Sequence, residues 1–484
     1  MPRNILLVEP NYYTKFPPLG LMKISTYHKQ LGDKVRFVKG IKEDPAYEET
    51  WDRVYVSTLF TYDWKITVDT IKFYKRFVHN DHRRIIVGGI LATLMRDQLW
   101  KETGVPPLKY NILNFPGALG DNNNIIVDDL IPDYELFNDT SQNYSLINDS
   151  YFGYITRGCV HKCDFCGVPK LEPEFIGYRD IKTYLKSIAN KYGEKCNLIL
   201  FDNNVLASPR FEDIINDIIE MGFEKDSKYA YKSKQGTQIK RARCVDFNQG
   251  IDARLINSKN IKLLSRIAID PLRIAFDHIS LKKIYRKSVE LAIHNGIHKL
   301  SNYILYNHKD NPEDFWERLH LNIEINSVYS KNGIKIYSFP MKYIPLNAKN
   351  RSHIDQNWNW YFIRSIQRIL NVVKGVVMPG EDFFYRAFGQ NIEEFQKILY
   401  MPEKILMYRD REPKADEISW LNKFDALTSN EKLELLSIIN NSTRAKLYEA
   451  VRQTENQKLK NILDYYLPEN QAKDLGTLWG DLDD

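Results

Sequence analysis

Apolar positions in residues 1–145 follow two alternating spacings. Short apolar runs, which are typical of buried strands, occur at residues 4–10, 34–40, 52–60 and 83–90. Helical spacing of apolar residues lies between them, at 20–32, where Gly32 is a stop signal, and at 64–79. Alternating strands and helices predict a parallel, doubly wound α/β sheet of the Rossmann-like kind. Ligands bind such sheets at the carboxyl ends of the strands, which here are residues 9–13, 58–64 and 88–93.

The alternation resumes near residue 152 and continues through six strand–helix units. Strand patterns occur at 152–158, 197–204, 245–252, 272–278, 300–307 and 334–345. Helical spacing occurs between and after them, at 180–192, 208–223, 257–267, 281–296 and 312–330. Six β/α units predict an open (β/α)6 partial barrel, whose active face is formed by the carboxyl ends of its strands. Polar residues gather at these ends: Asp202, Asn203, Asn204, Asn248, Gln249, Asp252, Asp277 and Asn307.

The last part of the chain is predicted to be all-helical. Helical spacing is found at 360–373, 392–408, 430–441 and 444–467. A chain of 484 residues is too long for one ordinary domain. We therefore expect three domains: a Rossmann-like domain at 1–145, a partial barrel at 146–350 and a helical domain at 351–484.

Composition excludes some classes of protein. With 43% hydrophobic residues the chain can bury a core, and it has no apolar run long enough to cross a membrane. Its first residues indicate a strand and not a signal peptide. The odd count of five cysteines, without a secretion signal, favours a reducing, cytoplasmic compartment over a disulfide framework. The net charge of +6 permits an anionic partner without requiring one.

Three of the five cysteines lie together, just past the first strand of the second alternation. Their spacing is Cys159-x3-Cys163-x2-Cys166. Three thiolates in one loop can bind a soft metal or an iron–sulfur cluster. A structural zinc site would need a fourth ligand, and His161, between two of the cysteines, is poorly placed to supply it. Three ligands leave one position open, as catalytic metal sites do. We expect Cys196 and Cys244, which lie apart, to be ordinary buried thiols.

The pattern Cys-x3-Cys-x-aromatic-Cys, with Phe165 at the aromatic position, resembles the radical S-adenosylmethionine (radical SAM) superfamily. The resemblance covers roughly residues 146–350 and implies that the three cysteines hold a [4Fe-4S] cluster. It implies that SAM chelates the fourth iron and is cleaved to a 5′-deoxyadenosyl radical by an electron from a flavodoxin- or ferredoxin-type donor. Enclosure by strand ends would shield such a radical from solvent. The substrate and any further catalytic residue stay unidentified.

The resemblance also implies cofactor contacts, in addition to Phe165 of the motif. Asp202, Asn203 and Asn204 at the second strand end would touch the amino group of SAM. Gln249 and Arg254 are candidates for the ribose and the carboxylate, since a guanidinium can bind a carboxylate through two hydrogen bonds. Pairing of Arg254 with a nearby acid is the equal alternative. The fifth strand lacks the glycine-rich turn of related enzymes, which leaves the adenine contact open.

Residues 6–21 and 85–95 resemble the cobalamin-binding domain that precedes some radical SAM enzymes. The Asp-x-His-x-x-Gly loop, whose histidine ligates cobalt in that domain, is absent from this sequence. Two interpretations stay open: a Rossmann-like domain for packing or substrate docking, which we favour, and cobalamin binding without the histidine. The second would make the chain a cobalamin-assisted methyltransferase. No cysteine precedes Cys159, which argues against a methylthiotransferase with a second cluster.

Basic and aromatic residues crowd residues 224–243. The members of this set are Lys225, Lys228, Tyr229, Tyr231, Lys232, Lys234, Lys240, Arg241 and Arg243. Such interleaving suits nucleic acid. The segment joins a helix to the next strand, however, and so belongs at the end of the barrel opposite the active face. We favour a solvated insertion, and keep a non-enzymatic, metal-stabilised nucleic-acid-binding protein as the alternative of another class.

Overall fold

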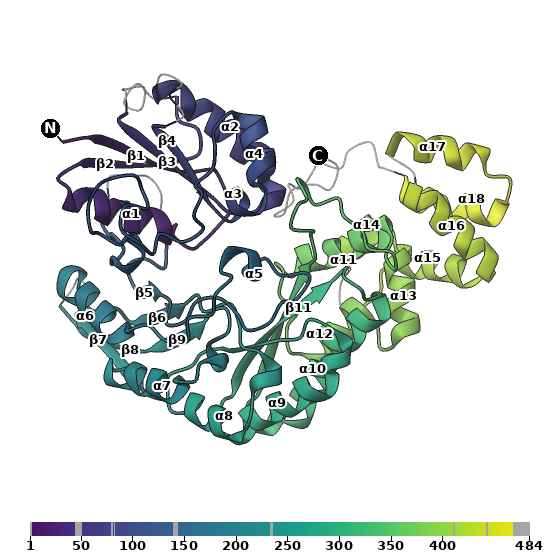
Figure 1. Cartoon of the computed structure of the whole chain (residues 1–484). Helices are drawn as coiled ribbons and strands as arrows, with labels where there is room; N and C mark the ends of the chain where they lie inside the picture. The colour runs from purple at the N-terminus through teal and green to yellow at the C-terminus, as the bar shows by residue number, and fades with distance from the viewer. Residues whose placement is uncertain are drawn as a thin grey trace. The chain divides into compact units, whose positions relative to one another are not determined.

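The computed structural model describes residues 2–43, 51–78, 81, 83–138, 144–232, 236–409, 412–441 and 444–467 (Figure 1). The chain divides into two compact units. The first comprises Met1–Arg273, Glu290–Ile297 and Ile344–Arg351, and the second comprises Ile274–Val289, His298–Tyr343 and Ser352–Asp484. In the described part of the chain, none of the helices has the length and apolar character needed to span a membrane.

The first unit begins with the predicted doubly wound sheet. Its strands are β1 (Asn4–Glu9), β2 (Lys34–Lys39), β3 (Arg53–Thr58) and β4 (Ile85–Gly89), in the order β2-β1-β3-β4 with every pair parallel. The helices are α1 (Leu19–Gln30), α2 (Trp64–Lys75), α3 (Ile90–Leu94) and α4 (Arg96–Thr103). Helix α1 lies on one side of the sheet, and α2 and α4 lie on the other (Figure 1).

Alternation along the strands explains these two layers. Successive side chains of a strand point to opposite faces, so every second residue of β1, β3 and β4 faces α2 and α4. These side chains and the apolar stripes of the helices form one buried core, which includes Leu6, Val8, Val54, Val56, Ile85, Val87, Val68, Ile71, Leu91 and Leu99.

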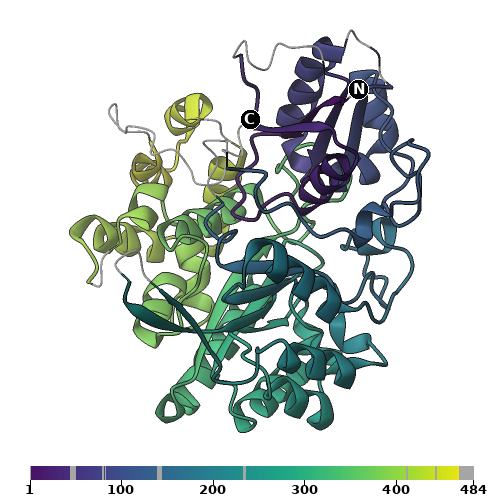
Figure 2. The same ribbon diagram turned by 90° about the vertical axis from the view of Figure 1, so that its left-hand side faces the viewer.

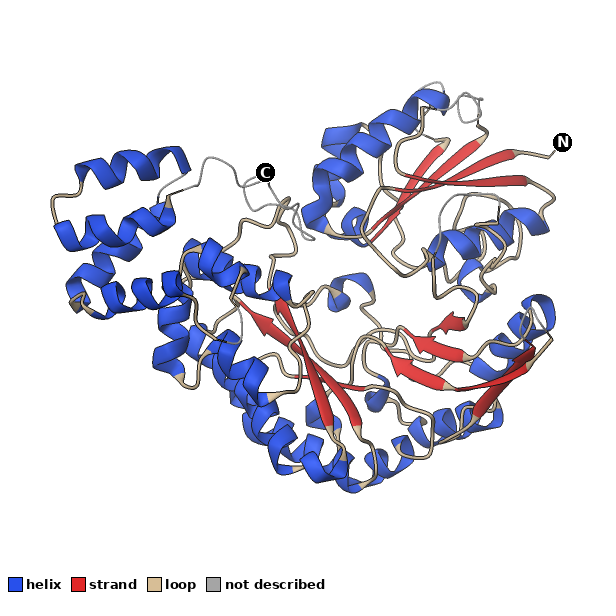
Figure 3. Cartoon of the chain, turned by 180° about the vertical axis from the view of Figure 1, so that it is seen from behind, coloured by secondary structure: helices blue, strands red, loops and turns tan. Residues whose placement is uncertain are grey.

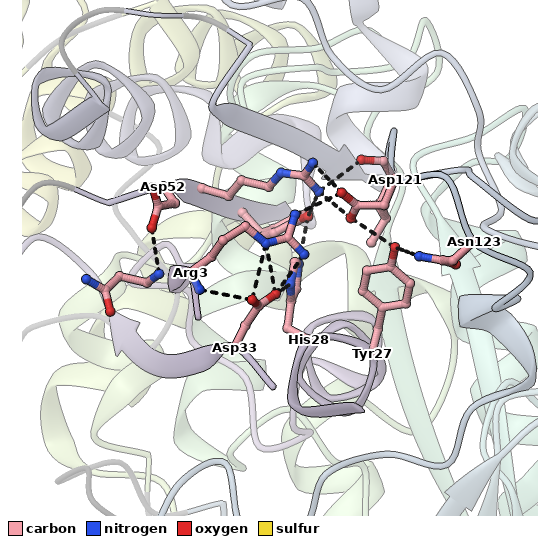
Figure 4. A network of polar contacts seen from close by, with 11 residues as sticks. Arg3, Tyr27, His28, Asp33, Asp52, Asp121 and Asn123 are labelled. Atoms are coloured by element: carbon pink, nitrogen blue, oxygen red, sulfur yellow. Dashed lines mark hydrogen bonds and ion pairs between the residues drawn. The ribbon is translucent and has the colours of Figure 1, made fainter. Parts of the chain in front are cut away.

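A polar network ties the amino ends of β1 and β3 to the segment that follows α4 (Figure 4). The Asp121 carboxylate accepts hydrogen bonds from both terminal nitrogens of Arg53 at 2.7 Å, from Arg3 at 2.8 Å and from the Tyr27 hydroxyl at 2.9 Å. Arg3 also pairs with Asp33 at 2.7 Å. The network lies at the sheet edge opposite to the one where ligands bind, and we assign it a structural role.

The second alternation begins with a parallel sheet in the order β5-β6-β9. Its strands are β5 (Ser150–Gly153), β6 (Asn197–Leu200) and β9 (Cys244–Phe247), and its helices are α5 (Val168–Leu171), α6 (Ile181–Tyr192), α7 (Phe211–Glu220) and α8 (Ser258–Leu264). Strand β5 is shorter than predicted. The backbone N–H groups of Ile155 and Thr156 donate to the Asp202 side chain, so the chain leaves the ladder after Gly153.

An antiparallel hairpin, which the sequence analysis did not predict, lies between α7 and β9. It consists of β7 (Lys228–Lys232) and β8 (Gln238–Ala242) and faces the viewer in Figure 2. It accounts for most of the basic segment, while Lys234 lies outside the described residues.

The remaining strands form the sheet β10-β11-β12, with β10 (Leu272–Ala275), β11 (Lys299–Tyr306) and β12 (Lys335–Lys342), and β11 and β12 are parallel. Helices α9 (Lys282–His294) and α10 (Pro312–Val328) connect them. All six predicted strands are thus present, in two three-stranded sheets. The chain that leads into β10 runs along β9, where Ile269 and Val245 form a parallel bridge. Closure into one partial barrel stays a prediction.

The C-terminal part is helical, as predicted, and Figure 3 shows no strand in its described residues after β12. Its helices are α11 (Trp360–Val372), α12 (Glu381–Phe388), α13 (Ile392–Tyr400), α14 (Glu403–Met407), α15 (Ala415–Asp425), α16 (Ser429–Asn441), α17 (Arg444–Gln453) and α18 (Gln457–Leu463). The predicted helix 392–408 is broken into α13 and α14, because Met401 precedes Pro402 and is extended, with ψ of 142°. Aromatic residues such as Phe384, Phe395 and Trp420 fill the core of this part.

Candidate active site

The register of the sheet β5-β6-β9 brings three strand ends to one edge. Gly153 pairs with Leu200, and Leu200 pairs with Phe247, so the three strands end level with one another. The cysteine segment, the Asp202–Asn204 segment and the Asn248–Asp252 segment follow these ends. The predicted site residues of this sheet therefore start from a common edge.

The cysteine loop, residues 158–175, is closed at its base by backbone hydrogen bonds. Arg157 N donates to Ile176 O at 3.0 Å, and Ile176 N donates to Arg157 O at 2.9 Å. The loop opens with Gly158, whose φ of +72° is a conformation that other residues rarely adopt. A Cβ at Gly158 would also lie 2.3 Å from the carbonyl oxygen of Glu174. The loop in this form thus requires glycine before the first cysteine.

The Glu172 side chain, which was not among the predicted site residues, holds the loop through contacts with three different residues. Its Oε2 accepts from Gly158 N at 2.6 Å and from Asn203 Nδ2 at 3.0 Å. Its Oε1 lies 3.2 Å from Arg157 Nη1, and the two side chains are only 13% and 9% exposed. One carboxylate thus joins both ends of the cysteine loop to the end of β6. No motif could have revealed it, since two of its partners are a backbone amide and a side chain distant in sequence.

Asp202 lies buried beneath the start of the loop. Its Oδ1 accepts from Ile155 N at 3.0 Å, from Thr156 N and from Thr156 Oγ1 at 2.7 Å. Burial raises the pKa of Asp202 to about 6, although these hydrogen bonds oppose the shift. Its Oδ2 is buried and has no hydrogen-bond partner among the described residues. Asp202 therefore holds the backbone with one oxygen and leaves the other open.

Asn204 makes the direct contact between β6 and the first cysteine. Its Nδ2 donates to Cys159 Sγ at 3.4 Å, and its Oδ1 is buried without a hydrogen-bond partner in the described part of the chain. None of the three cysteines of the motif is in a disulfide, and all three are of intermediate exposure. Within the loop, Cys166 N donates to Cys163 O at 3.1 Å.

The segment after β9 reaches the same loop through Asp252. The Asp252 carboxylate accepts two hydrogen bonds from Arg254, at 2.8 and 2.9 Å, and lies 2.7 Å from His161 Nε2. The pKa of Arg254 is raised, first by its hydrogen bond to Asp252 and, despite partial burial, further by Cys163. Arg254 thus has the acidic partner that was one of its two predicted roles, and it also lies beside the second cysteine.

The structure does not gather every predicted residue in this way. Phe165 is half-buried on the cysteine loop, and Gln249 is exposed in the turn after β9. Asp277 and Asn307 belong to the second unit. There Asn307 is buried, and its side chain bonds Tyr343 O and His353 O, which is a structural role.

The two cysteines outside the motif have the surroundings of ordinary thiols. Cys196 is fully buried, and burial raises its pKa. The Cys244 sulfur lies 2.7 Å from the carbonyl oxygen of Asp270, and burial raises its pKa to about 12. Burial thus disfavours the thiolate form of both side chains.

The donor set of the loop fits an iron–sulfur cluster. Across the ranges that the structure describes, no three His, Cys, Asp or Glu side chains are arranged to hold a single metal ion. A [4Fe-4S] cluster takes each cysteine thiolate on a separate iron, and three half-buried cysteine side chains on one loop supply such ligands. The open oxygens of Asp202 and Asn204 lie on the segment that contacts Cys159.

A charge cluster around Asp128 links the N-terminal sheet to this region. Asp128 pairs with Arg179 at 2.7 Å, with Lys23 of α1 at 3.5 Å and with Arg157 at 3.7 Å. Beside it lies a cavity of about 260 Å³, whose lining includes Lys23, Tyr154, Arg179 and Tyr184. Burial lowers the pKa of Lys23 to about 8, against the attraction of Asp128. The cations at this cavity are paired with acids, and we assign it no ligand.

The carboxyl ends of the strands of the N-terminal sheet were the predicted place for a ligand of this domain, whether cobalamin or another. At this edge Glu9 is buried and paired with Lys39 at 3.1 Å and with the Tyr144 hydroxyl. A Cβ at Gly89 would lie 2.2 Å from Thr58 O, so the glycine pair lets β3 and β4 approach closely. In the described part of residues 1–145 the single histidine is His28, which bonds Asp33 and Tyr55 in the network of Figure 4.

No protein-family model matches the chain, and no curated protein matches it. Two solved structures of TsrM from Kitasatospora setae, a radical S-adenosylmethionine methyltransferase, are similar to it. One, with cobalamin and a [4Fe-4S] cluster bound, is 13% identical with a TM-score of 0.46 and covers 72% of this chain and 77% of its own. The other, with tryptophan substrate and a SAM analog (aza-SAM) bound, has the same identity and score and covers 76% of this chain and 77% of its own.

At 13% identity and a TM-score of 0.46, the chemistry of this chain has to be argued from its own residues.

Proposed function

We propose that the chain is a radical SAM enzyme. In this proposal Cys159, Cys163 and Cys166 hold a [4Fe-4S] cluster, and SAM bound to it is cleaved reductively to a 5′-deoxyadenosyl radical that acts on a substrate still to be identified. The observation that carries the proposal is the cysteine loop itself. Its three cysteines follow the carboxyl end of β5, and Glu172 and Asn204 fasten the loop to the neighbouring strand end.

The residues around the loop receive roles that follow from their contacts. The open acceptors Asp202 Oδ2 and Asn204 Oδ1 would accept hydrogen bonds from the ammonium group of SAM. Arg254, beside Cys163, would face its carboxylate with the nitrogen that Asp252 does not bind. Gln249 stays a candidate for the ribose, and Phe165 stays a candidate for a cofactor contact of the motif. The proposal includes closure of the sheets β5-β6-β9 and β10-β11-β12 into a partial barrel. It also includes an electron donor of the flavodoxin or ferredoxin type.

The test compares the five cysteines of one chain. After anaerobic reconstitution, alanine at Cys159, Cys163 or Cys166 is expected to remove most iron and acid-labile sulfide and all reductive SAM cleavage, because each thiolate binds its own iron. Alanine at Cys196 or Cys244 is the matched control and should leave both readouts intact. A Cys163→Ala protein with a full cluster would show that the assignment is wrong.

Two alternatives are separated by simple binding measurements. We expect cobalamin binding to be weak or absent, because the described N-terminal sheet edge offers no histidine to cobalt. Stoichiometric retention of hydroxocobalamin in anaerobic gel filtration would refute this and favour cobalamin-assisted methyl transfer. Zinc without acid-labile sulfide would instead favour the non-enzymatic, metal-stabilised nucleic-acid-binding protein.

A further inference from the structure

The hairpin of β7 and β8 has two chemically different faces. The register pairs Tyr229 with Arg241 and Tyr231 with Ile239, so these four side chains share one face. Lys228, Lys232 and Lys240 lie on the other face, together with Ala230, Gln238 and Ala242. Every residue of this second face is exposed, and neither strand contains an acidic residue. We call this second face the lysine face.

The opposite face of the hairpin, with Tyr229, Tyr231, Ile239 and Arg241, is attached to the rest of the first unit. The Tyr229 hydroxyl donates to Glu194 O at 3.0 Å, and Arg241 pairs with Asp149 at 2.8 Å. The rings of Tyr229 and Tyr231 stack with centroids 5.9 Å apart, and the Arg243 guanidinium lies over Tyr229. These contacts hold the hairpin in place and turn the lysine face to solvent.

We propose that the lysine face binds the phosphate backbone of a nucleic-acid duplex. At about 3.3 Å per residue, Lys228 and Lys232 stand roughly 13 Å apart along β7, and Lys240 lies between them on β8. Among the described residues no acid forms an ion pair with these three lysines, and a group of such ammonium ions matches a polyanion with regularly repeated charge. A two-stranded ribbon also has the width to enter the major groove of B-form DNA.

Two other partners fit this face poorly. Single strands are held largely by stacking of bases on aromatic rings, and both tyrosines are on the attached face. Membrane surfaces require apolar side chains that enter the acyl boundary, and the lysine face offers only alanines. Contact with phosphates alone carries no sequence information, so binding will not discriminate among sequences.

This surface is distinct from the site of the proposed radical chemistry. Strand β8 ends at Ala242, and β9 starts at Cys244, so the hairpin lies at the amino end of β9. The cysteine loop follows the carboxyl end of β5, which is parallel to β9 within one sheet. The hairpin and the cysteine loop therefore lie at opposite ends of the strands of that sheet. The duplex is inferred as a binding partner of the chain.

The experiment measures binding and needs neither cluster nor SAM. Fluorescence anisotropy of short DNA and RNA duplexes, and of the single strands, is followed over a range of salt concentrations with the full chain. The triple variant Lys228→Gln, Lys232→Gln, Lys240→Gln is compared with Lys101→Gln, Lys186→Gln, Lys262→Gln, which changes three exposed helical lysines. Both triple variants lose the same charge, and circular dichroism checks that both remain folded.

The hairpin variant is expected to bind duplex roughly 10²- to 10³-fold more weakly at about 0.1 M salt, with a log–log salt slope smaller by about 2 to 3. The helical control should bind as the wild-type chain does. The measurements with DNA and with RNA show which duplex is preferred. Tighter binding of either duplex than of its single strands supports the proposal. Equal affinity and slope for the hairpin variant, tighter binding of single strands, or binding to anionic vesicles without binding to duplex would each overturn it.

Discussion

Removal of the Glu172 carboxylate is expected to loosen the cysteine loop before any cluster is bound. In Glu172→Ala, Gly158 N and Asn203 Nδ2 lose their acceptor, and Arg157 loses an ion-pair partner at 3.2 Å. Hydrogen bonds to a charged group contribute about 1.5–3 kcal/mol each, and loss of one partner of a buried pair costs about 3–5 kcal/mol. The three contacts share one carboxylate and do not add, so we expect about 3–4 kcal/mol.

Hydrogen–deuterium exchange of the cluster-free full chain measures this change where it occurs. A loss of 3–4 kcal/mol corresponds to roughly 10²- to 10³-fold faster exchange in peptides that cover β5 and the loop, with peptides of the N-terminal sheet unchanged. Iron and sulfide contents after reconstitution should fall in parallel. Glu172→Gln, which keeps an acceptor for Gly158 N but loses the charge, is expected to lie between the wild-type chain and the alanine variant.

Glu174→Ala is the matched control, because Glu174 is an exposed glutamate in the same loop. It should exchange and load iron as the wild-type chain does. If Glu172→Ala exchanges as slowly as Glu174→Ala, the carboxylate does not fasten the loop. If Glu172→Ala exchanges faster than Glu174→Ala yet loads a full cluster, the cluster alone can order the loop. Cluster assembly then does not depend on the contacts of Glu172.

Two further perturbations test particular atoms. Gly158→Ala should abolish cluster loading, because the position combines a φ of +72° with a Cβ only 2.3 Å from a backbone oxygen. Gly193→Ala is the control and should load normally, because Gly193 has a φ of +78° but nothing within 4 Å of an added Cβ. Equal cluster loading by the two variants would contradict the reasoning. Burial opposes ionisation of Asp121, yet Arg53 and Arg3 hold its pKa at about 2. Its stabilising effect is complete above about pH 4 and is lost as the pH falls toward 2, so in urea unfolding Asp121→Asn should be less stable than wild type near neutrality and lose this difference in acid.

The three-cysteine loop and the strand ends were predictable because they depend on local pattern. Alternation of strand and helix predicted β5, β6 and β9, and the structure confirms that the strand ends after which Cys159 and Asp202 follow lie at one edge of a parallel sheet. The partners of the loop were not predictable. Glu172 bonds a backbone amide and a side chain 31 residues away, and no residue spacing encodes such contacts.

The hairpin was missed for a different reason. In residues 228–232 tyrosine occupies every second position, which is the period of a strand, but the place of the segment between a helix and the next strand favoured a solvated insertion. In the structure this alternation separates the two kinds of side chain, which composition alone does not predict. It places Tyr229 and Tyr231 on the face that is attached to the body and Lys228 and Lys232 on the face that meets solvent.

The buried polar atoms around Cys159 restrict what can bind beside the loop. Asp202 Oδ2 and Asn204 Oδ1 are both acceptors, and neither has a hydrogen-bond partner among the described residues. A buried acceptor without a partner costs about 1–3 kcal/mol, which a ligand recovers only if it brings N–H or O–H donors. An ammonium group has three such donors and a positive charge opposite the Asp202 carboxylate, whereas a carboxylate or phosphate has none and would be repelled. The anionic end of any ligand must therefore turn away from these two oxygens, and Arg254, which contacts the cysteine loop from the end of β9, is a cation that can receive it.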